Sequence, residues 1–565
     1  MSKMTTAVLA RGSGKTNIRD ILNAPTADNA VTNFMDGISY ELSPLETLKI
    51  VSASSIFGEP QYYRNGEFAD RTAKDGTYQL GEYFQGQPVL SDKYNNMTTS
   101  ALFEKLTDEA LEADFEGTLK WAVELRNTFN MRLNPQVIMV RAAASPERPY
   151  YTINNHGSFD TYNQAVMQRA DDVLAQITYY LYRHGSKSKI PGVLKRSWNN
   201  KISTLTRYEM AKYKNHGIGM IDAVRIAHAK GPVIDELMRT GTVQVEDSDM
   251  TWEKLKSEGK SWAEILDQIQ MPYMALLRNL RGIFKEIDDV KTCDDIMSKL
   301  ARGVNRSRQF PFRYMSTMNA VKAERDKIHH AQRVLDGLET CMDTACANLP
   351  KLKGRSAFLS DNSGSAWEGL TSEYGTVHVA NIDNLSSVIG AVNSDEGHVY
   401  PFGDRLMHYE ISKRDGILQQ ADRISREANA RVGGNTENGV WLFFKEAIRD
   451  KVHWDNIFIY SDQQAGHGGL YGSTDEAELY KKQGFSINSS AYSLPYIDVA
   501  KLIEAYRRTV NPKVNVFTIQ TAGYSNVLVP ENGYRTSVLY GWTGRELVYA
   551  DAINKFWDKY DANHT

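Results

Sequence analysis

The chain has 565 residues, too many for one hydrophobic core, so about two to four domains are expected. Hydrophobic residues make up 41% and charged residues 24% of the sequence, which excludes a disordered chain. No apolar run of about 18 residues occurs, which excludes a helical membrane span. The three cysteines (Cys293, Cys341, Cys346) cannot form a disulfide framework, and the polar N-terminus does not resemble a secretory signal. We therefore expect a cytoplasmic protein without a membrane partner.

The net charge of −3 hides an uneven distribution along the chain. Residues 355–565 carry 20 Lys and Arg against 26 Asp and Glu, so residues 1–354 have a net charge of +3. Residues 181–230 carry eleven Lys and Arg against only Glu209 and Asp222. A local net charge of +9 indicates a polyanionic partner.

From about residue 40 to residue 349 the pattern favours short helices separated by Gly, Pro and Asn. Residues 169–183, for example, place apolar side chains at 3.6-residue spacing. The other expected helices are 192–199, 203–213, 220–229, 232–239, 262–269, 272–286 and a long one near 312–347. Many short helices in series are typical of a stacked helical array, here without a sharp sequence repeat.

After Pro350 short apolar strands alternate with helices. The expected strands are 356–360, a hairpin of 398–402 and 406–411, 456–460, 514–519 and 538–540; the expected helices are 440–449, 497–510 and 546–560. This alternation predicts a doubly wound, mostly parallel sheet covered on both faces. We therefore expect a helical domain over residues 16–353 and an α/β domain over residues 354–565.

Oxygen-bearing side chains follow two of the expected strands. Asp361, Ser363 and Ser365 come directly after the first strand in the sequence SDNSGS, and Asp462 follows the strand 456–460. In open α/β sheets ligands bind beyond the carboxyl ends of the strands, and hard cations such as Mg²⁺ prefer oxygen ligands. The alternative is a solvated turn and helix cap.

The D-x-S-x-S pattern resembles the metal-ion-dependent adhesion site of von Willebrand factor A domains. This resemblance implies that Asp361, Ser363, Ser365, Thr436 and Asp462 bind Mg²⁺ or Mn²⁺. It also implies a metal-dependent protein-interaction module as an alternative function. Thr436, in GGNTENG, departs from the pattern because an additional Asn separates it from the glycine pair.

In the basic segment, cations alternate with Trp198, Tyr208 and Tyr213. Cations neutralise phosphates and aromatic rings stack on unpaired bases, so the pattern favours nucleic acid. The alternative is that the rings fill a core while the lysines face water. The candidate cationic contacts are Lys187, Lys189, Lys195, Arg196, Lys201, Arg207, Lys212, Lys214 and Arg225.

Several segments, in the same order, are similar to the Ro (SS-A) autoantigen family. They are KYKNHGIGMIDAVRIAHAK, MPYMALLRNLRGIF, QFPFRYMSTMNAV, FLSDNSGSAW, IFIYSDQQAGHGG and GWTGRELVYADAINKF. Bacterial-type members of that family join a ring of HEAT-like helical repeats, the TROVE domain, to a von Willebrand factor A domain. The resemblance implies this fold here; residues 1–150 show little similarity to the family.

The resemblance also implies a function. Ro proteins bind small noncoding Y RNA on the outside of the ring and single-stranded 3′ ends of misfolded RNA in its cavity, in RNA quality control or in tethering an exoribonuclease such as polynucleotide phosphorylase. By position, the Y RNA contacts correspond to Lys212, His216 and His228. The alternative for His228 is a core or helix-terminal histidine, which is the commoner case for a lone His. His216 departs from the family pattern, which has an arginine there, so a permanent charge becomes titratable.

Catalysis is not expected. GSGKT at residues 12–16 resembles a P-loop, but the required first glycine is Leu9. The sequence also contains no H-E-x-x-H, no G-x-S-x-G and no zinc-spaced cysteines. His329-His330 and Cys341-x₄-Cys346 are expected to be surface and core positions of a helix.

Overall fold

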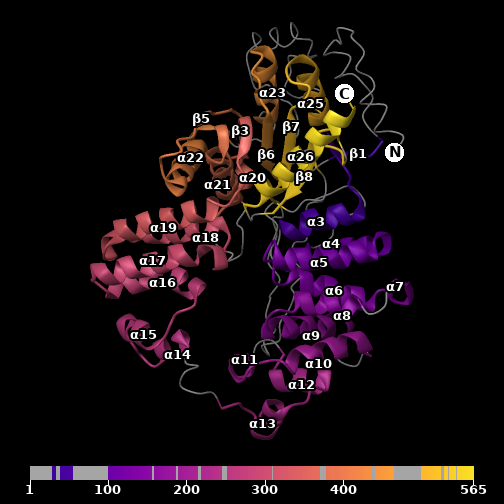
Figure 1. Ribbon diagram of the computed structural model, residues 1–565, viewed down its shortest axis with the longest axis vertical. Coiled ribbons are helices and arrows are strands. Elements are labelled where there is room, and N and C mark those ends of the chain that lie inside the picture. Colours follow the sequence, from indigo (N-terminus) through magenta and orange to yellow (C-terminus); the bar gives the residue numbers. More distant parts are fainter. Residues whose placement is uncertain are drawn as a thin grey trace.

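The computed structural model contains a long run of helices and an α/β domain (Figure 1). It describes residues 28–32, 38–54, 99–154, 158–185, 189–213, 218–244, 251–307, 309–368, 377–433, 439–463, 498–522, 527–531, 533–541 and 544–564. The N-terminal GSGKT segment lies outside these residues. No helix of the described residues combines the length and apolarity that a bilayer crossing requires.

The first run of helices packs around one apolar core. It comprises α3 (Pro44–Ala53), α4 (Thr99–Ala113), α5 (Phe115–Asn127), α6 (Asn134–Ala144), α7 (Arg148–Asn154), α8 (Ser158–Val166), α9 (Ala170–His184), α10 (Gly192–Ile202), α11 (Arg207–Lys212), α12 (Met220–Ala227) and α13 (Pro232–Thr240). A continuous cluster of buried side chains extends from Leu48 to Val243. The expected helices between residues 169 and 239 are confirmed, with ends shifted by a few residues.

The second run has a core that continues into the α/β domain. It comprises α14 (Trp252–Ser257), α15 (Trp262–Gln268), α16 (Tyr273–Glu286), α17 (Val290–Ser307), α18 (Pro311–Ala323) and α19 (Ala331–Cys346). The prediction of a single long helix near residues 312–347 is wrong. A 3₁₀ turn, η3 (Arg325–Lys327), and a left-handed His330 (φ 55°) separate α18 from α19. There the backbone N–H of His329 donates to the Phe284 carbonyl of α16 (2.7 Å), so a tertiary contact fixes the break.

The α/β domain has a six-stranded sheet with the order β5-β4-β3-β6-β7-β8. Its strands are β3 (Leu352–Asp361), β4 (Ser394–Phe402), β5 (Tyr409–Glu410), β6 (Asn456–Ser461), β7 (Asn515–Gln520) and β8 (Thr536–Tyr540). All neighbours pair in parallel except the β4–β5 hairpin. The doubly wound, mostly parallel sheet is therefore confirmed.

Helices cover both faces of this sheet. One layer contains α21 (Val379–Val392), α22 (Ile417–Arg431) and α26 (Glu546–His564), and the other contains α23 (Gly439–Arg449) and α25 (Val499–Thr509). The sequence patterns did not predict α21 or α22. In α21 most side chains are buried, so it lacks the amphipathic periodicity on which the other predictions depend.

The helices follow a ring-like path that begins and ends at the α/β domain (Figure 1). At the beginning, β1 (Ala30–Thr32) pairs with β2 (Ile38–Tyr40), and Tyr40 exchanges backbone hydrogen bonds with Val527 (2.8 and 3.2 Å). The Tyr40 hydroxyl also donates to Asp498 (2.6 Å). At the end, α19 packs against α22. The fold is thus an irregular HEAT-like ring joined to a domain of the von Willebrand factor A type.

Candidate nucleic-acid interface and candidate metal centre

The predicted metal ligands of two separate strands meet at one edge of the sheet. Asp361 is the last residue of β3, and Asp462 follows β6, the parallel neighbour of β3. The Ser461 hydroxyl lies between the two carboxylates, 2.7 Å from Asp361 and 3.2 Å from Asp462. Parallel pairing of strands that are 100 residues apart in sequence therefore brings these carboxylates together.

The serines of the D-x-S-x-S motif lie on the same loop. The Ser363 backbone N–H donates to Asp361 (2.9 Å), which folds the loop back onto its own carboxylate. The Ser363 and Ser365 hydroxyl oxygens are 3.0 Å apart at the start of α20 (Gly364–Glu368). The structure thus gathers Asp361, Ser363, Ser365 and Asp462, while Thr436 lies outside the described residues.

Asp383, which no sequence motif identifies, adds a third buried carboxylate close to Asp361. It belongs to α21, and its oxygen accepts a hydrogen bond from Thr521 (3.4 Å), which follows β7. Burial, followed by the charge of Asp361, raises the pKa of Asp383 well above its usual value. A signal was present, because Asp383 is the one charged residue of the segment VANIDNLSSVIGAV.

The electrostatics of the cluster suit a cation. Burial, followed by the charge of Asp462, raises the pKa of Asp361 above its usual value. No lysine or arginine of the described residues forms an ion pair with Asp361 or Asp383. Buried carboxylates this close repel one another unless a proton or a cation neutralises them. An all-oxygen donor set fits Mg²⁺ or Mn²⁺.

The carboxylates alone do not complete a coordination shell. Among the described residues, no three His, Cys, Asp or Glu side chains converge on one metal position. The serine hydroxyls and water would supply the remaining ligands, as Mg²⁺ commonly requires. A cation at this position would therefore take most of its ligands from hydroxyl groups and water.

The predicted basic contacts lie on neighbouring short helices at one end of the first helical run (Figure 1). Lys195, Arg196 and Lys201 belong to α10, Arg207 and Lys212 to α11, and Arg225 to α12, with Lys189 before α10 and His228 after α12. Lys187, Lys214 and His216 lie outside the described residues. Lys189, Arg196, Arg207, Lys212, Arg225 and His228 are exposed, and Lys195 and Lys201 are half-buried.

These cationic side chains differ in whether a carboxylate already forms an ion pair with them. Arg207 pairs with Glu236 (2.8 Å) and Arg225 with Asp222 (3.5 Å). By contrast, Lys189, Lys195 and Arg196 have no carboxylate partner among the described residues. Unpaired cations need no rearrangement before they bind a phosphate. These three are therefore the more effective candidate contacts.

Lys212 lies among tyrosine rings. Its ammonium group is 5.5 Å from the ring centre of Tyr208 and 5.7 Å from that of Tyr213. The Tyr213 hydroxyl accepts a hydrogen bond from Arg169 (2.7 Å), which holds this ring in place. A cation fixed beside two half-buried rings offers a phosphate contact and an aromatic surface together.

The stacking role expected for Trp198 is wrong. Its side chain is fully buried and donates to Gln176 (2.9 Å) within the core of the first helical run. The structure also makes His228 a helix-terminal residue and not a core histidine. It ends α12 in the left-handed conformation (φ 56°), its carbonyl accepts from Asn199 (2.8 Å), and its side chain is exposed.

Two comparisons place this architecture among known proteins. Residues 238–339 match the model of the TROVE domain. The fold is similar to the crystal structure of the RO (RSR) protein of Deinococcus radiodurans, with a TM-score of 0.53 and 13% sequence identity. That match covers 91% of this chain and 99% of the Deinococcus chain. Together they confirm the resemblance to the Ro family that the sequence motifs predict.

Proposed function

We propose that this chain, which carries a TROVE domain and has the fold of a Ro protein, is an RNA-binding protein. The basic surface of α10, α11 and α12 carries this proposal. It presents Lys189, Lys195 and Arg196 without acidic partners among the described residues, and Lys212 beside two tyrosines. A charged surface of this kind binds phosphates by releasing condensed counterions.

The finer proposal concerns the kind of RNA. Short helices with separated cations suit the regularly spaced phosphates of a folded RNA, which proteins read mainly by shape and backbone. We infer a small structured Y-like RNA on this surface and single-stranded 3′ ends of misfolded RNA in the ring. The protein then acts in RNA quality control in the cytoplasm, without catalysis of its own, and brings an exoribonuclease to its substrate through the RNA.

A gel-shift titration tests the proposal. The probe is a small structured RNA with a single-stranded 3′ tail, and the salt concentration is varied. We expect binding whose logarithm falls linearly with the logarithm of salt concentration. Binding that is insensitive to salt, or no tighter than to a random-sequence RNA, contradicts the proposal.

A variant with a reversed charge tests where the RNA-binding surface lies. Lys212→Glu should weaken RNA binding roughly tenfold and reduce the salt slope by more than about one. The matched control is Lys559→Glu, an exposed lysine of α26 on the α/β domain. Equal affinities of the two variants would move the contact surface away from α11.

A second function is favoured by the oxygen cluster of Asp361, Ser363, Ser365 and Asp462. With Thr436 as a further ligand, these residues would hold Mg²⁺ or Mn²⁺, which supplies a Lewis-acidic position for the carboxylate of a partner protein. Calorimetry with Mn²⁺ tests this proposal. Heats that are equal for the wild type and Asp361→Ala would argue against the metal site.

A further inference from the structure

The loop that carries the candidate metal ligands is tied to α21 through Asn362. This residue lies between Asp361 and Ser363, and its side chain is buried. Its Nδ2 donates a hydrogen bond to Oδ1 of Asn384 on α21 (2.9 Å), and Nδ2 of Asn384 donates to Oδ1 of Asn362 (2.8 Å). Each of the two amides therefore fixes the position and the orientation of the other.

Asn384 uses all of its hydrogen-bonding capacity in this network. Its Oδ1 also accepts from the Ser360 hydroxyl (2.7 Å), and its Nδ2 also donates to the Ser425 hydroxyl (3.1 Å). An asparagine amide has two N–H groups and two acceptor positions, so both polar atoms of this fully buried side chain are satisfied. Rotation of the amide would break several of these hydrogen bonds at once, so the side chain is held in one orientation.

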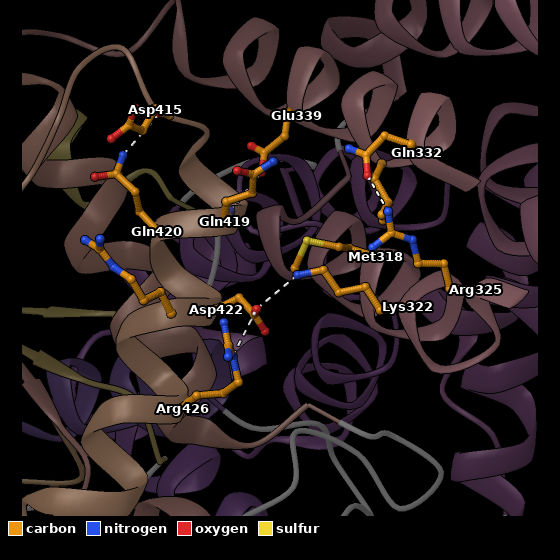
Figure 2. Close-up of a pocket in the computed structure, with 12 residues that line it drawn as sticks. Met318, Lys322, Arg325, Gln332, Glu339, Asp415, Gln419, Gln420, Asp422 and Arg426 are labelled. Carbon is orange, nitrogen blue, oxygen red and sulfur yellow. Dashed lines mark hydrogen bonds and ion pairs between the residues drawn. The ribbon is translucent and has the colours of Figure 1, made fainter. Parts of the chain in front are cut away.

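The elements that hold Asn384 are themselves fixed by other contacts. Ser360 belongs to the central strand β3, and Ser425 belongs to α22. The first backbone N–H groups of α22 donate to Glu339 of α19, and Asp422 of α22 pairs with Lys322 of α18 at 3.0 Å (Figure 2). The loop is therefore anchored on a rigid base, which a precisely built site requires.

The loop needs such an anchor because its carboxylate is repelled by a neighbour. The Ser461 hydroxyl lies between the carboxylates of Asp361 and Asp462, and both carboxylates are buried. Without a cation, their repulsion favours movement of Asp361 away from Asp462. Asn362 opposes this movement, because it follows Asp361 in the chain and its amide is fixed on α21. Residues that orient metal ligands without touching the metal commonly change metal affinity by about 10–100-fold.

We propose that Asn384 is a positioning residue for the candidate metal centre. Through Asn362 it holds residues 361–365 in the conformation that gathers their aspartate and serine oxygens before a cation binds. The inference rests on the metal site proposed above. It gives the buried amide pair a role in metal affinity, separate from its contribution to the stability of the core.

Calorimetric titration of the full chain with Mn²⁺ tests the proposal. Asn384→Ala should bind Mn²⁺ about tenfold more weakly than the wild type, because the cation must then order the loop itself. The matched control is Asn393→Ala, directly after α21. Its amide is also buried, but it donates to the Ile389 carbonyl (2.9 Å) of its own helix. This control should lower stability and still bind Mn²⁺ like the wild type.

A double-mutant cycle shows whether Asn384 acts through Asn362. Asn362→Ala breaks the same amide pair without altering α21, so it should lose Mn²⁺ affinity to a similar extent, and it carries the test if Asn384→Ala does not fold. The double variant Asn362→Ala/Asn384→Ala should bind Mn²⁺ no more weakly than Asn362→Ala alone, because the two side chains act as one unit. Losses of affinity that add in the double variant would overturn the proposed route.

Hydrogen exchange in a chelating buffer gives a readout that needs no cation. The Ser363 N–H donates to Asp361 (2.9 Å), so its exchange rate reports on the conformation of the loop. Exchange in the peptide that contains residues 361–365 should be about tenfold faster in Asn384→Ala than in the wild type, and unchanged in Asn393→Ala.

The outcomes separate this inference from the metal site on which it rests. If the wild type does not bind Mn²⁺, the metal site and the inference fail together. If the wild type binds Mn²⁺, the inference alone fails when Asn384→Ala matches the wild type in affinity or in loop exchange. It also fails when Asn393→Ala loses as much affinity as Asn384→Ala, because the effect would then follow from stability.

Discussion

The carboxylate of Glu339, in the last helix of the ring, accepts a hydrogen bond from the backbone N–H of Leu418 at the start of α22 in the α/β domain (3.0 Å). The same carboxylate accepts a second one from Gln419 (2.8 Å). It thereby acts as an N-cap supplied by a distant segment, and it balances the positive end of the helix dipole. A Cβ on Gly416, which precedes α22, would lie 2.5 Å from the Glu339 carboxyl carbon, so a larger residue there would displace this carboxylate from the helix end.

Glu339→Ala should therefore weaken the junction. Two N–H groups at a buried helix end would lose their acceptor, which costs about 1–3 kcal/mol. Glu339→Gln keeps one acceptor oxygen and should cost less. Urea unfolding of the full chain measures both, and equal unfolding midpoints for Glu339→Ala and the wild type would show that the cap contributes nothing.

A buried ion pair lies inside the first helical run. Arg126 and Asp172 are 3.1 Å apart, and both side chains are at most 4% exposed. Asp172 also accepts from the backbone N–H groups of Gln168 (3.0 Å) and Arg169 (2.9 Å). Asp172→Ala would leave a buried unpaired guanidinium, so we expect a loss of about 3–5 kcal/mol.

The neighbouring Asp171 supplies the control for that prediction. It pairs with Arg132 and Arg169, whose side chains are about half exposed, and solvent weakens such pairs. Asp171→Ala should therefore lower the thermal midpoint less than Asp172→Ala. Equal shifts in thermal denaturation would mean that burial does not determine the effect.

Addition of a divalent cation should stabilise the protein through the Asp361–Asp462 cluster. At a Mn²⁺ concentration about 100 times the dissociation constant, linkage predicts about 2.7 kcal/mol. Asp361→Asn removes one ligand and also the repulsion from Asp462, so the metal-free variant should be no less stable than the wild type. A Mn²⁺-dependent thermal shift that survives in Asp361→Asn would contradict the site.

We expect His408, which contacts a second imidazole, to make the α/β domain sensitive to acid. Nδ1 of His398 lies 2.8 Å from Nε2 of His408, and His398 also contacts Glu396 at 2.8 Å. Burial, then the charges of His398 and Arg355, lower the pKa of His408 from its usual 6.5, against the opposing charge of Glu410. The unfolded chain then binds more protons than the folded one, so stability should fall as the pH drops below about 6.5.

His408→Phe tests this pH dependence, because it keeps a ring to stack on Tyr400 (centroid distance 4.7 Å) but cannot bind a proton. The urea midpoint of the variant should change less between pH 7.5 and pH 5 than that of the wild type. Parallel curves for the two proteins would assign the acid sensitivity to other groups.

Local sequence determined the amphipathic helices, the candidate metal ligands and the basic segment of this protein. Helices with one apolar face, such as 169–183, were predicted because burial of that face is a local pattern with a 3.6-residue period. The pairing of Asp361 with Asp462 was predicted because parallel strands end at the same edge of a sheet. The charge of residues 181–230 also follows directly from composition.

Only the tertiary structure decided the rest, because it depends on which distant segments touch. The break before His330 depends on a contact with Phe284, and the burial of Trp198 depends on its hydrogen bond to Gln176. Asp383 reaches the oxygen cluster because it lies on α21. This helix is buried on nearly all sides, so its sequence shows no amphipathic periodicity from which the helix could be predicted. The cap that Glu339 provides for α22 exists only where α19 meets α22, because Glu339 and Leu418 are 79 residues apart in the sequence.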